Sequence, residues 1–85
     1  MVYVDNMFAR YGRFVMCHMW AADEVELEAM ARELKLKKKW GQRTSRWYHY
    51  DVSKTKREEA LANGAQAVTC RELVGLVQEA RSAVH

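Results

Sequence analysis

Two histidines and two aspartates are the residues of this chain best suited to chemistry. His49 and Asp51 stand two positions apart in a run over 47–52 whose aromatic and β-branched content predicts a strand. Side chains two apart on a strand share a face, so the carboxylate can orient the imidazole, as general bases and metal ligands require. Together with His18 and Asp5 they make a metal site chemically feasible, although none of the spacings is a metal signature.

A second candidate site gathers hydroxyl and basic side chains at the ends of predicted strands. Ser53 and Thr69 each follow a predicted strand and open a predicted helix, whose free N–H groups attract anions. Ligands of open α/β sheets bind outside the carboxyl ends of parallel strands, and Asp5 joins this edge if the first strand is parallel to the other two. The cations within reach of a phosphate there are Lys56, Arg57 and Arg71. The alternative is that the hydroxyls only cap helices and the bases are surface charges.

The elements that must position these residues alternate between strands and helices. Strands are predicted at 2–5, 13–20, 47–52 and 66–69, and 6–12 is expected to be a loop. Asp23, Ser53 and Thr69 are predicted to cap three helices, of which the second ends at Asn63-Gly64. The expected fold is α+β: a mixed four-stranded sheet with three helices in the order β-β-α-β-α-β-α. The strand–helix–strand segment 48–69 is expected to make parallel neighbours through a right-handed crossover.

Length and composition predict a single domain over residues 1–85. An apolar fraction of 49% with 29% charged residues is typical of a globular protein and argues against disorder. No run of 18 apolar residues is present, which predicts that the chain does not span a membrane. The sequence begins without an export signal, so Cys17 and Cys70 are interpreted as reduced thiols and a cytoplasmic location is expected.

Basic charge is concentrated in one segment. The net charge is only +3, but Lys35 to Arg46 holds six bases and no acid. Aromatic residues interleave with arginines at its end, in the set Trp40, Arg43, Arg46, Trp47, Tyr48 and Tyr50. Such a pattern suits nucleobase stacking with phosphate contacts, and the alternative is a solvated loop.

Several stretches of the chain resemble a known family. These are Met-Val-Tyr-Val-Asp5, His18-Met-Trp-Ala-Ala-Asp23, His49-Tyr-Asp-Val-Ser-x-x-Lys56-Arg57 and Val68-Thr-x-Arg-Glu72. Together they resemble small bacterial and phage proteins grouped as domain-of-unknown-function family 4031, over nearly the whole chain. The family brings no established activity. The resemblance implies that one polar constellation contains Asp5, His18, His49, Tyr50, Asp51, Lys56 and Arg57. A fainter likeness links the chain to metal-dependent PIN-type nucleases, but Cys70 stands where they have an acid.

Three functions follow as hypotheses. The leading one is a phage-associated or mobile-element protein that binds a phosphorylated or nucleotide-like ligand, nucleic acid included, without a resident cofactor. The second is an interaction module that forms a homodimer or inhibits a host enzyme through large apolar residues, namely Phe8, Tyr11, Trp20, Trp40 and Trp47. The third is a metal-dependent phosphoesterase or nuclease that uses His18, His49 and Asp51.

Overall fold

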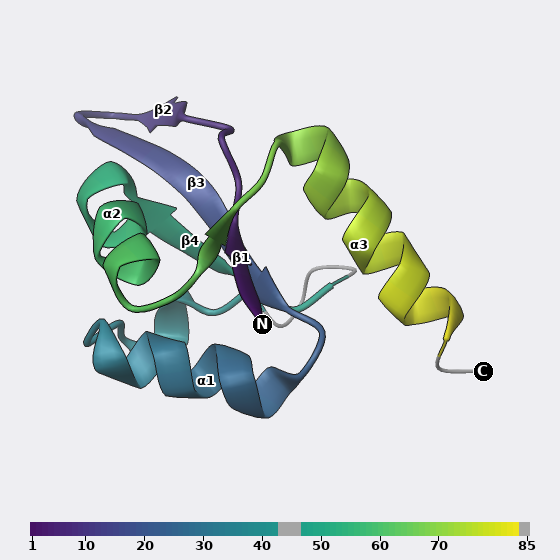
Figure 1. Ribbon diagram of the computed structural model, residues 1–85. Coiled ribbons are helices and arrows are strands. Elements are labelled where there is room, and N and C mark those ends of the chain that lie inside the picture. The colour runs from purple at the N-terminus through teal and green to yellow at the C-terminus, as the bar shows by residue number, and fades with distance from the viewer. Residues whose placement is uncertain (43–46, 84–85) are drawn as a thin grey trace.

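A computed structural model describes residues 1–42 and 47–83 of the chain. The fold is α+β: a mixed five-stranded sheet with α1 and α2 on one side and α3 on the other (Figure 1). In chain order the elements are β1 (Val2–Val4), β2 (Ala9–Tyr11), β3 (Phe14–Ala21), α1 (Glu24–Glu33), a short 3-10 helix (Lys38–Trp40), β4 (Tyr50–Ser53), α2 (Lys54–Ala62), β5 (Gln66–Ala67) and α3 (Cys70–Ser82). Arg43 and Arg46 of the predicted basic segment lie outside the described residues.

The long strand β3 organises the sheet because both of its edges are paired. On one edge β1 and β2 lie end to end, both antiparallel to β3, and β4 is antiparallel on the other edge. Met19, for example, pairs with Val4 on one side and with Tyr50 on the other. The strand β5 adds to β1 in parallel. Strands β1, β4 and β5 therefore run in one direction, and β3 runs against them.

The two faces of the sheet bury different amounts of apolar surface. On the face of α1 and α2, alternate strand residues such as Val4, Met19 and Val52 are almost completely buried against the helices. On the face of α3, Trp20 packs on Leu73 of that helix in a smaller cluster. Burying a side chain of this kind contributes about 1.5–3 kcal/mol each, so the first face supplies most of the core. The smaller cluster leaves the rest of the second face free to carry polar residues.

The three predicted helix starts are confirmed. The Asp23 carboxylate accepts the backbone N–H of Val25, and the Ser53 hydroxyl accepts that of Lys56. Thr69 and Glu72 form a reciprocal capping box at the start of α3. Each cap satisfies N–H groups that have no partner within the helix, which is why these residue types stand there.

The prediction of a loop over 6–12 is wrong, because β2 forms within it. Tyr11 pairs with Phe14 across a two-residue turn of Gly12 and Arg13, and Gly12 has a φ of 60°. A glycine at the first position of a two-residue hairpin turn matches the type II′ geometry that suits the twist of two antiparallel strands. The fifth strand therefore forms because the glycine at position 12 allows a tight hairpin turn.

The crossover over 48–69 also differs from the expectation. Strands β4 and β5 are parallel, as predicted, but β3 and β1 lie between them. The reason is that β3, eight residues long, offers a free edge that pairs with β4, whereas β5 has only two residues and pairs with β1. In addition, β4 begins at Tyr50 and not at residue 47.

Candidate metal centre

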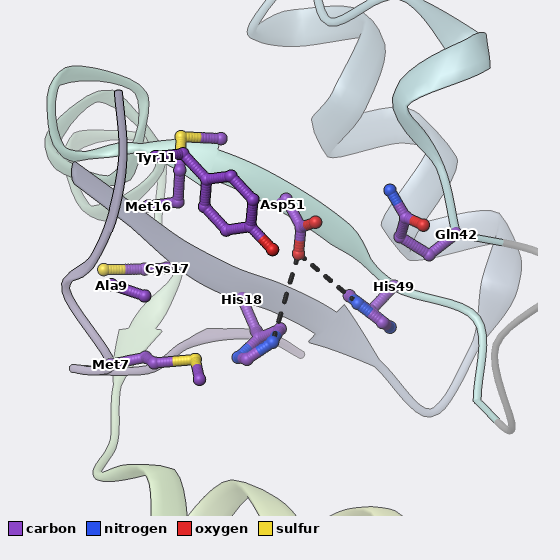
Figure 2. Close-up of a pocket in the computed structure, with 9 residues that line it drawn as sticks. All are labelled: Met7, Ala9, Tyr11, Met16, Cys17, His18, Gln42, His49 and Asp51. Carbon is purple, nitrogen blue, oxygen red and sulfur yellow. Dashed lines mark ion pairs between the residues drawn. The ribbon is translucent and has the colours of Figure 1, made fainter. Parts of the chain in front are cut away.

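Two neighbouring strands bring three metal-binding side chains to one point on the α3 face of the sheet. His18 on β3 is the direct cross-strand partner of Asp51 on β4. His49 lies just before β4, two residues before Asp51, and its side chain reaches the same face. All three line a pocket of about 220 Å³, in which Figure 2 shows both imidazoles beside the Asp51 carboxylate. Side chains far apart in the sequence therefore converge through strand pairing.

The distances suit a single small ion. Nε2 of His49 lies 3.4 Å from Oδ1 of Asp51, and Nε2 of His18 lies 4.0 Å from the same oxygen. One ligand atom from each of the three residues lies within 4.8 Å of the other two. A tetrahedral zinc ion with bonds of 2.0–2.1 Å would hold its ligands about 3.4 Å apart. The cluster needs to contract by less than about 1.5 Å to bind such an ion.

Asp5 fixes the orientation of His18. One oxygen, Oδ2, accepts the imidazole Nδ1–H at 2.7 Å and lies 3.6 Å from the Cys70 thiol. The other, Oδ1, accepts the backbone N–H groups of His18 at 2.8 Å and Met7 at 3.2 Å. Burial alone would raise the pKa of Asp5, but these hydrogen bonds outweigh it and hold the pKa below its usual value. The carboxylate raises the pKa of His18 in turn, against the opposing effect of burial.

A backbone carbonyl fixes the orientation of the His49 ring. Its Nδ1 lies 3.0 Å from the carbonyl oxygen of Trp47, and its ring stacks on the Trp47 indole at a centroid distance of 4.0 Å. The side chain is buried, and this burial lowers the pKa of His49 below its ordinary value. Burial therefore favours the neutral form of His49, in which the Nδ1–H donated to the carbonyl leaves the lone pair on Nε2.

The arrangement leaves a place for a cation. Both imidazoles use Nδ1–H for a hydrogen bond, so a neutral ring turns the lone pair of Nε2 toward the anionic oxygen of Asp51. Lone pairs that face a carboxylate repel unless a proton or a metal ion lies between them. A histidine that binds a metal through one nitrogen and donates the other N–H to a carboxylate or carbonyl is the usual arrangement at protein metal sites. His18, His49 and Asp51 are thus the residues that could hold a metal ion.

The remaining predicted site residues lie elsewhere. Tyr50 points to the opposite face of β4, where its hydroxyl contacts Glu28. Ser53 and Thr69 cap their helices, at strand ends about 14 Å apart if three strand spacings separate β4 from β5. The structure therefore does not bring the two hydroxyls into one anion pocket.

The three predicted cations are also dispersed. Lys56 Nζ donates to the Leu34 carbonyl at 2.8 Å, and Arg71 is exposed on α3. Arg57 Nε donates to the backbone carbonyl of Asp5 at 2.8 Å, and its guanidinium lies 5.1 Å from the centroid of the Phe8 ring. Arg57 therefore positions the segment that carries Asp5.

Several pocket residues were not anticipated from the sequence. Tyr11 and Met7 come from the β2 segment that was expected to be a loop, and Gln42 follows the 3-10 helix. The sequence signal for the first two was the Gly12 turn, which returns the chain along β3. The role of the Trp47 carbonyl had no sequence signal, because any residue type offers the same acceptor.

In the part of the chain that the structure describes, no helix is long and apolar enough to cross a membrane.

Comparison with known proteins gives one match. No curated protein and no solved structure matches the chain significantly. The family described as "Protein of unknown function (DUF4031)" matches residues 2–80, as the sequence resemblance implied. Since this match covers nearly all of its 85 residues, the chain belongs to that family.

Proposed function

We propose that this protein is a metal-dependent phosphoesterase that holds one divalent ion through His18, His49 and Asp51. The observation that carries the proposal is the shared target of the two imidazoles. Each has Nδ1 committed to a fixed acceptor, and each directs Nε2 at the same carboxylate oxygen. Asp5 and the Trp47 carbonyl would then be the outer partners that set ring orientation.

Three protein ligands are the number found in catalytic zinc sites, where the fourth position takes water or substrate. A bound ion polarises a phosphoryl oxygen and makes water acidic enough to supply hydroxide near neutral pH. In the reaction the water oxygen forms a bond to phosphorus and the bond to the leaving oxygen breaks. One water proton ends on the leaving oxygen, and the other remains with the product phosphate. Asp51, with its side chain 36% exposed, keeps the centre open to solvent and ligand.

A phosphorylated substrate is favoured by the charges beside the centre. Lys39 and Lys56 line a second pocket that also contains Asp51. Cations next to a metal ion complement the negative charge of a phosphoester and would disfavour a cationic or neutral substrate. Nucleotide-like ligands, which the sequence also suggested, belong to this class.

Metal binding is the first test. The protein is freed of metal with a chelator and titrated with Co²⁺ and Zn²⁺ by calorimetry and by tryptophan fluorescence, since Trp47 stacks on His49. We expect one ion per chain, and loss of at least about 100-fold in affinity for Asp51→Asn and His49→Gln, more than removal of an outer partner costs. Glu59→Gln, which changes an exposed carboxylate on α2, is the matched control and should bind as the wild type does. Equal binding by all variants would refute the site.

Turnover is the second test. The metal-loaded protein is assayed with bis(p-nitrophenyl) phosphate and with p-nitrophenyl phosphate, against Asp51→Asn and the chelator-treated protein. Release of nitrophenol that requires both the ion and Asp51 is expected. If the protein binds one ion but releases no more nitrophenol than Asp51→Asn, it is a metal-binding protein and the hydrolase proposal fails.

An interaction module is the second candidate, because Tyr11 is 70% and Phe14 56% exposed on neighbouring strands. Trp20 is buried and Trp47 is packed in the α3 cluster, so neither contributes to such a surface. A homodimer or a host enzyme as partner, phage association and a cytoplasmic location remain predictions. Cys17 and Cys70 are both free thiols, which suits a reducing compartment.

A further inference from the structure

We infer that the groove beside the proposed metal centre binds a nucleobase, so that the phosphoester acted on is a nucleotide or a nucleic-acid strand. This inference rests on the proposed function and narrows its substrate class. The groove has a volume of about 420 Å³ and lies between β3, the 3-10 helix and the start of α2. Its aromatic walls are Phe14 and Trp40, and its cations are Lys39 and Lys56.

The groove and the metal pocket are adjacent and share part of their lining. Met16, Gln42 and Asp51 line both of them, so a single molecule can touch both at once. Asp51 is also the residue to which both imidazoles turn. A ligand whose phosphate lies at the centre can therefore extend its organic part into the groove.

The aromatic walls have the exposure that a stacking site needs. Trp40 is 43% and Phe14 is 56% exposed, whereas the other two tryptophans pack around α3. A nucleobase is a flat apolar partner, and its stacking on an exposed aromatic ring is favourable whatever the base. The ammonium group of Lys37 lies 5.8 Å from the centroid of the Trp40 ring. Lys37 and Lys39 therefore place positive charge beside the stacking surface.

Charge selects an anionic occupant over an apolar peptide. Four of the five residues from 35 to 39 are lysines, and Lys39 reaches the groove. Across the groove, Lys56 Nζ donates to the Leu34 carbonyl and lies 3.5 Å from a Glu59 oxygen. An ammonium group has three N–H donors, so one is left for a phosphate. Aromatic faces with lysines beside them recognise a base and its phosphates together.

Two sources offer this chemistry, a free mononucleotide and a single strand. The experiment uses the zinc-loaded protein and measures dissociation constants by calorimetry for AMP, ribose 5-phosphate and the oligonucleotide dT8. We expect AMP or dT8 to bind at least about tenfold more tightly than ribose 5-phosphate, as one base–aromatic stack implies. Tighter binding of dT8 than of AMP assigns the groove to nucleic acid, and the reverse assigns it to free nucleotides.

Variants test whether the groove is responsible. Trp40→Ala and Lys39→Ala should lose about tenfold in affinity for AMP or dT8, and Trp40→Ala should keep the wild-type affinity for ribose 5-phosphate. Val74→Ala, at an exposed apolar residue on α3, is the matched control. A zinc stoichiometry of one in each variant shows that it is folded.

Failure of this inference is distinguishable from failure of the proposed function. If AMP, dT8 and ribose 5-phosphate bind equally, or if Trp40→Ala changes none of them, the base site is refuted while zinc binding and phosphoester turnover can still stand. If zinc does not bind at all, the proposed function itself is refuted. Binding of AMP or dT8 that persists unchanged in metal-free protein and in Trp40→Ala also overturns the inference.

Discussion

Two clusters on opposite faces of the extended chain over residues 48–51 are built alike but have opposite hydrogen bonding. Each contains one carboxylate and two ring side chains: Glu28 with Tyr48 and Tyr50 on the α1 face, and Asp51 with His18 and His49 on the α3 face. They are separated only by the alternation of side chains along the strand. What differs is where the hydrogen atoms are.

In the tyrosine cluster, the phenol donors find their acceptor within the cluster. Both phenol groups donate to the Glu28 carboxylate, Tyr50 at 3.2 Å, and the two hydroxyls lie 3.2 Å apart. Burial, the Glu28 carboxylate and the neighbouring Tyr50 all raise the pKa of Tyr48, so its proton stays in place. Gly41 lets the cluster close, because a Cβ there would lie 2.7 Å from the Tyr48 hydroxyl.

In the histidine cluster, the ring N–H donors find their acceptors outside the cluster. Its two N–H donors are used outward, toward Asp5 and the Trp47 carbonyl, and no donor is left for Asp51 when both rings are neutral. The comparison shows that a carboxylate with two ring side chains can form hydrogen bonds within the cluster. When the ring donors are used elsewhere, the same arrangement leaves a place for an ion. The phenol groups donate inward to their carboxylate and the imidazole N–H groups donate outward, and this difference separates a scaffold from a binding site.

The largest expected effect is stabilisation of the protein by zinc. At free zinc about 1,000-fold above Kd, the free energy of unfolding should rise by about 4 kcal/mol. For a domain of this size the melting temperature should rise by about 15–30 °C. Thermal unfolding followed by circular dichroism measures the shift, and Asp51→Asn should show almost none of it. An unchanged melting temperature in the wild type would contradict the comparison.

The next effect compares the two carboxylates in metal-free protein. Glu28→Ala should lower the free energy of unfolding by about 2–3 kcal/mol, because it leaves two phenol groups without an acceptor. At a pH at which both imidazoles are neutral, Asp51→Ala should change it by less than about 0.5 kcal/mol or increase it, because it removes a charge that faces lone pairs. Urea unfolding measures both values. Equal losses for the two variants would mean that the clusters are equivalent.

Gly41→Ala tests closure of the tyrosine cluster. The new methyl group would lie 2.8 Å from the Cε1 atom of Tyr48, so the ring must leave its position beside Glu28. We expect a loss of about 1–2 kcal/mol in urea unfolding. Gly75→Ala on α3 is the control: nothing lies within 4 Å of the added carbon, and alanine should stabilise the helix by about 0.5–1 kcal/mol. A loss of equal size at both glycines would show that Tyr48 is not the cause.

The smallest effect is the opposite titration of the two histidines in metal-free protein. The pKa of His18 is raised, so its contribution to stability is present below the unfolded pKa of about 6.5 and is lost as pH rises through its folded pKa. The pKa of His49 is lowered, so its contribution is present above about 6.5 and is lost as pH falls through its folded pKa. NMR titration of the ring signals, assigned with His18→Gln and His49→Gln, should place one pKa on each side of 6.5. A pKa of His18 below 6.5 would contradict its hydrogen bond to Asp5, and a pKa of His49 above 6.5 would contradict the burial that lowers it.

Much of the site could be predicted from the sequence because it depends on local periodicity. The shared face of His49 and Asp51 follows from their spacing, and the parallel direction of β1 and β4 places Asp5 at the same edge of the sheet. The contact between His18 and Asp51, which the metal-site hypothesis assumed, could not be derived from the sequence. It depends on the register between β3 and β4, and a slip of one residue would turn His18 to the other face.

The fold shows the same division. Helix caps were readable because each depends on a few neighbouring residues. The insertion of β3 and β1 between β4 and β5 was not, since it results from competition between strand edges that lie far apart in the sequence. Gly12 does indicate the hairpin of β2, although a loop was predicted over residues 6–12.

The break between β1 and β2 constrains how the protein can vary in length. Where the ladder is interrupted, a side-chain oxygen of Asp5 takes the place of a backbone carbonyl and accepts the N–H of His18, and Phe8 turns the chain with a φ of 47°. A residue inserted between Asp5 and Phe8 would shift β2 along β3 and pull the carboxylate away from the imidazole. A residue inserted at the Gly12 turn would only lengthen an exposed hairpin. Natural variants and engineered fusions should therefore differ in length at the turn and keep the spacing between Asp5 and β2.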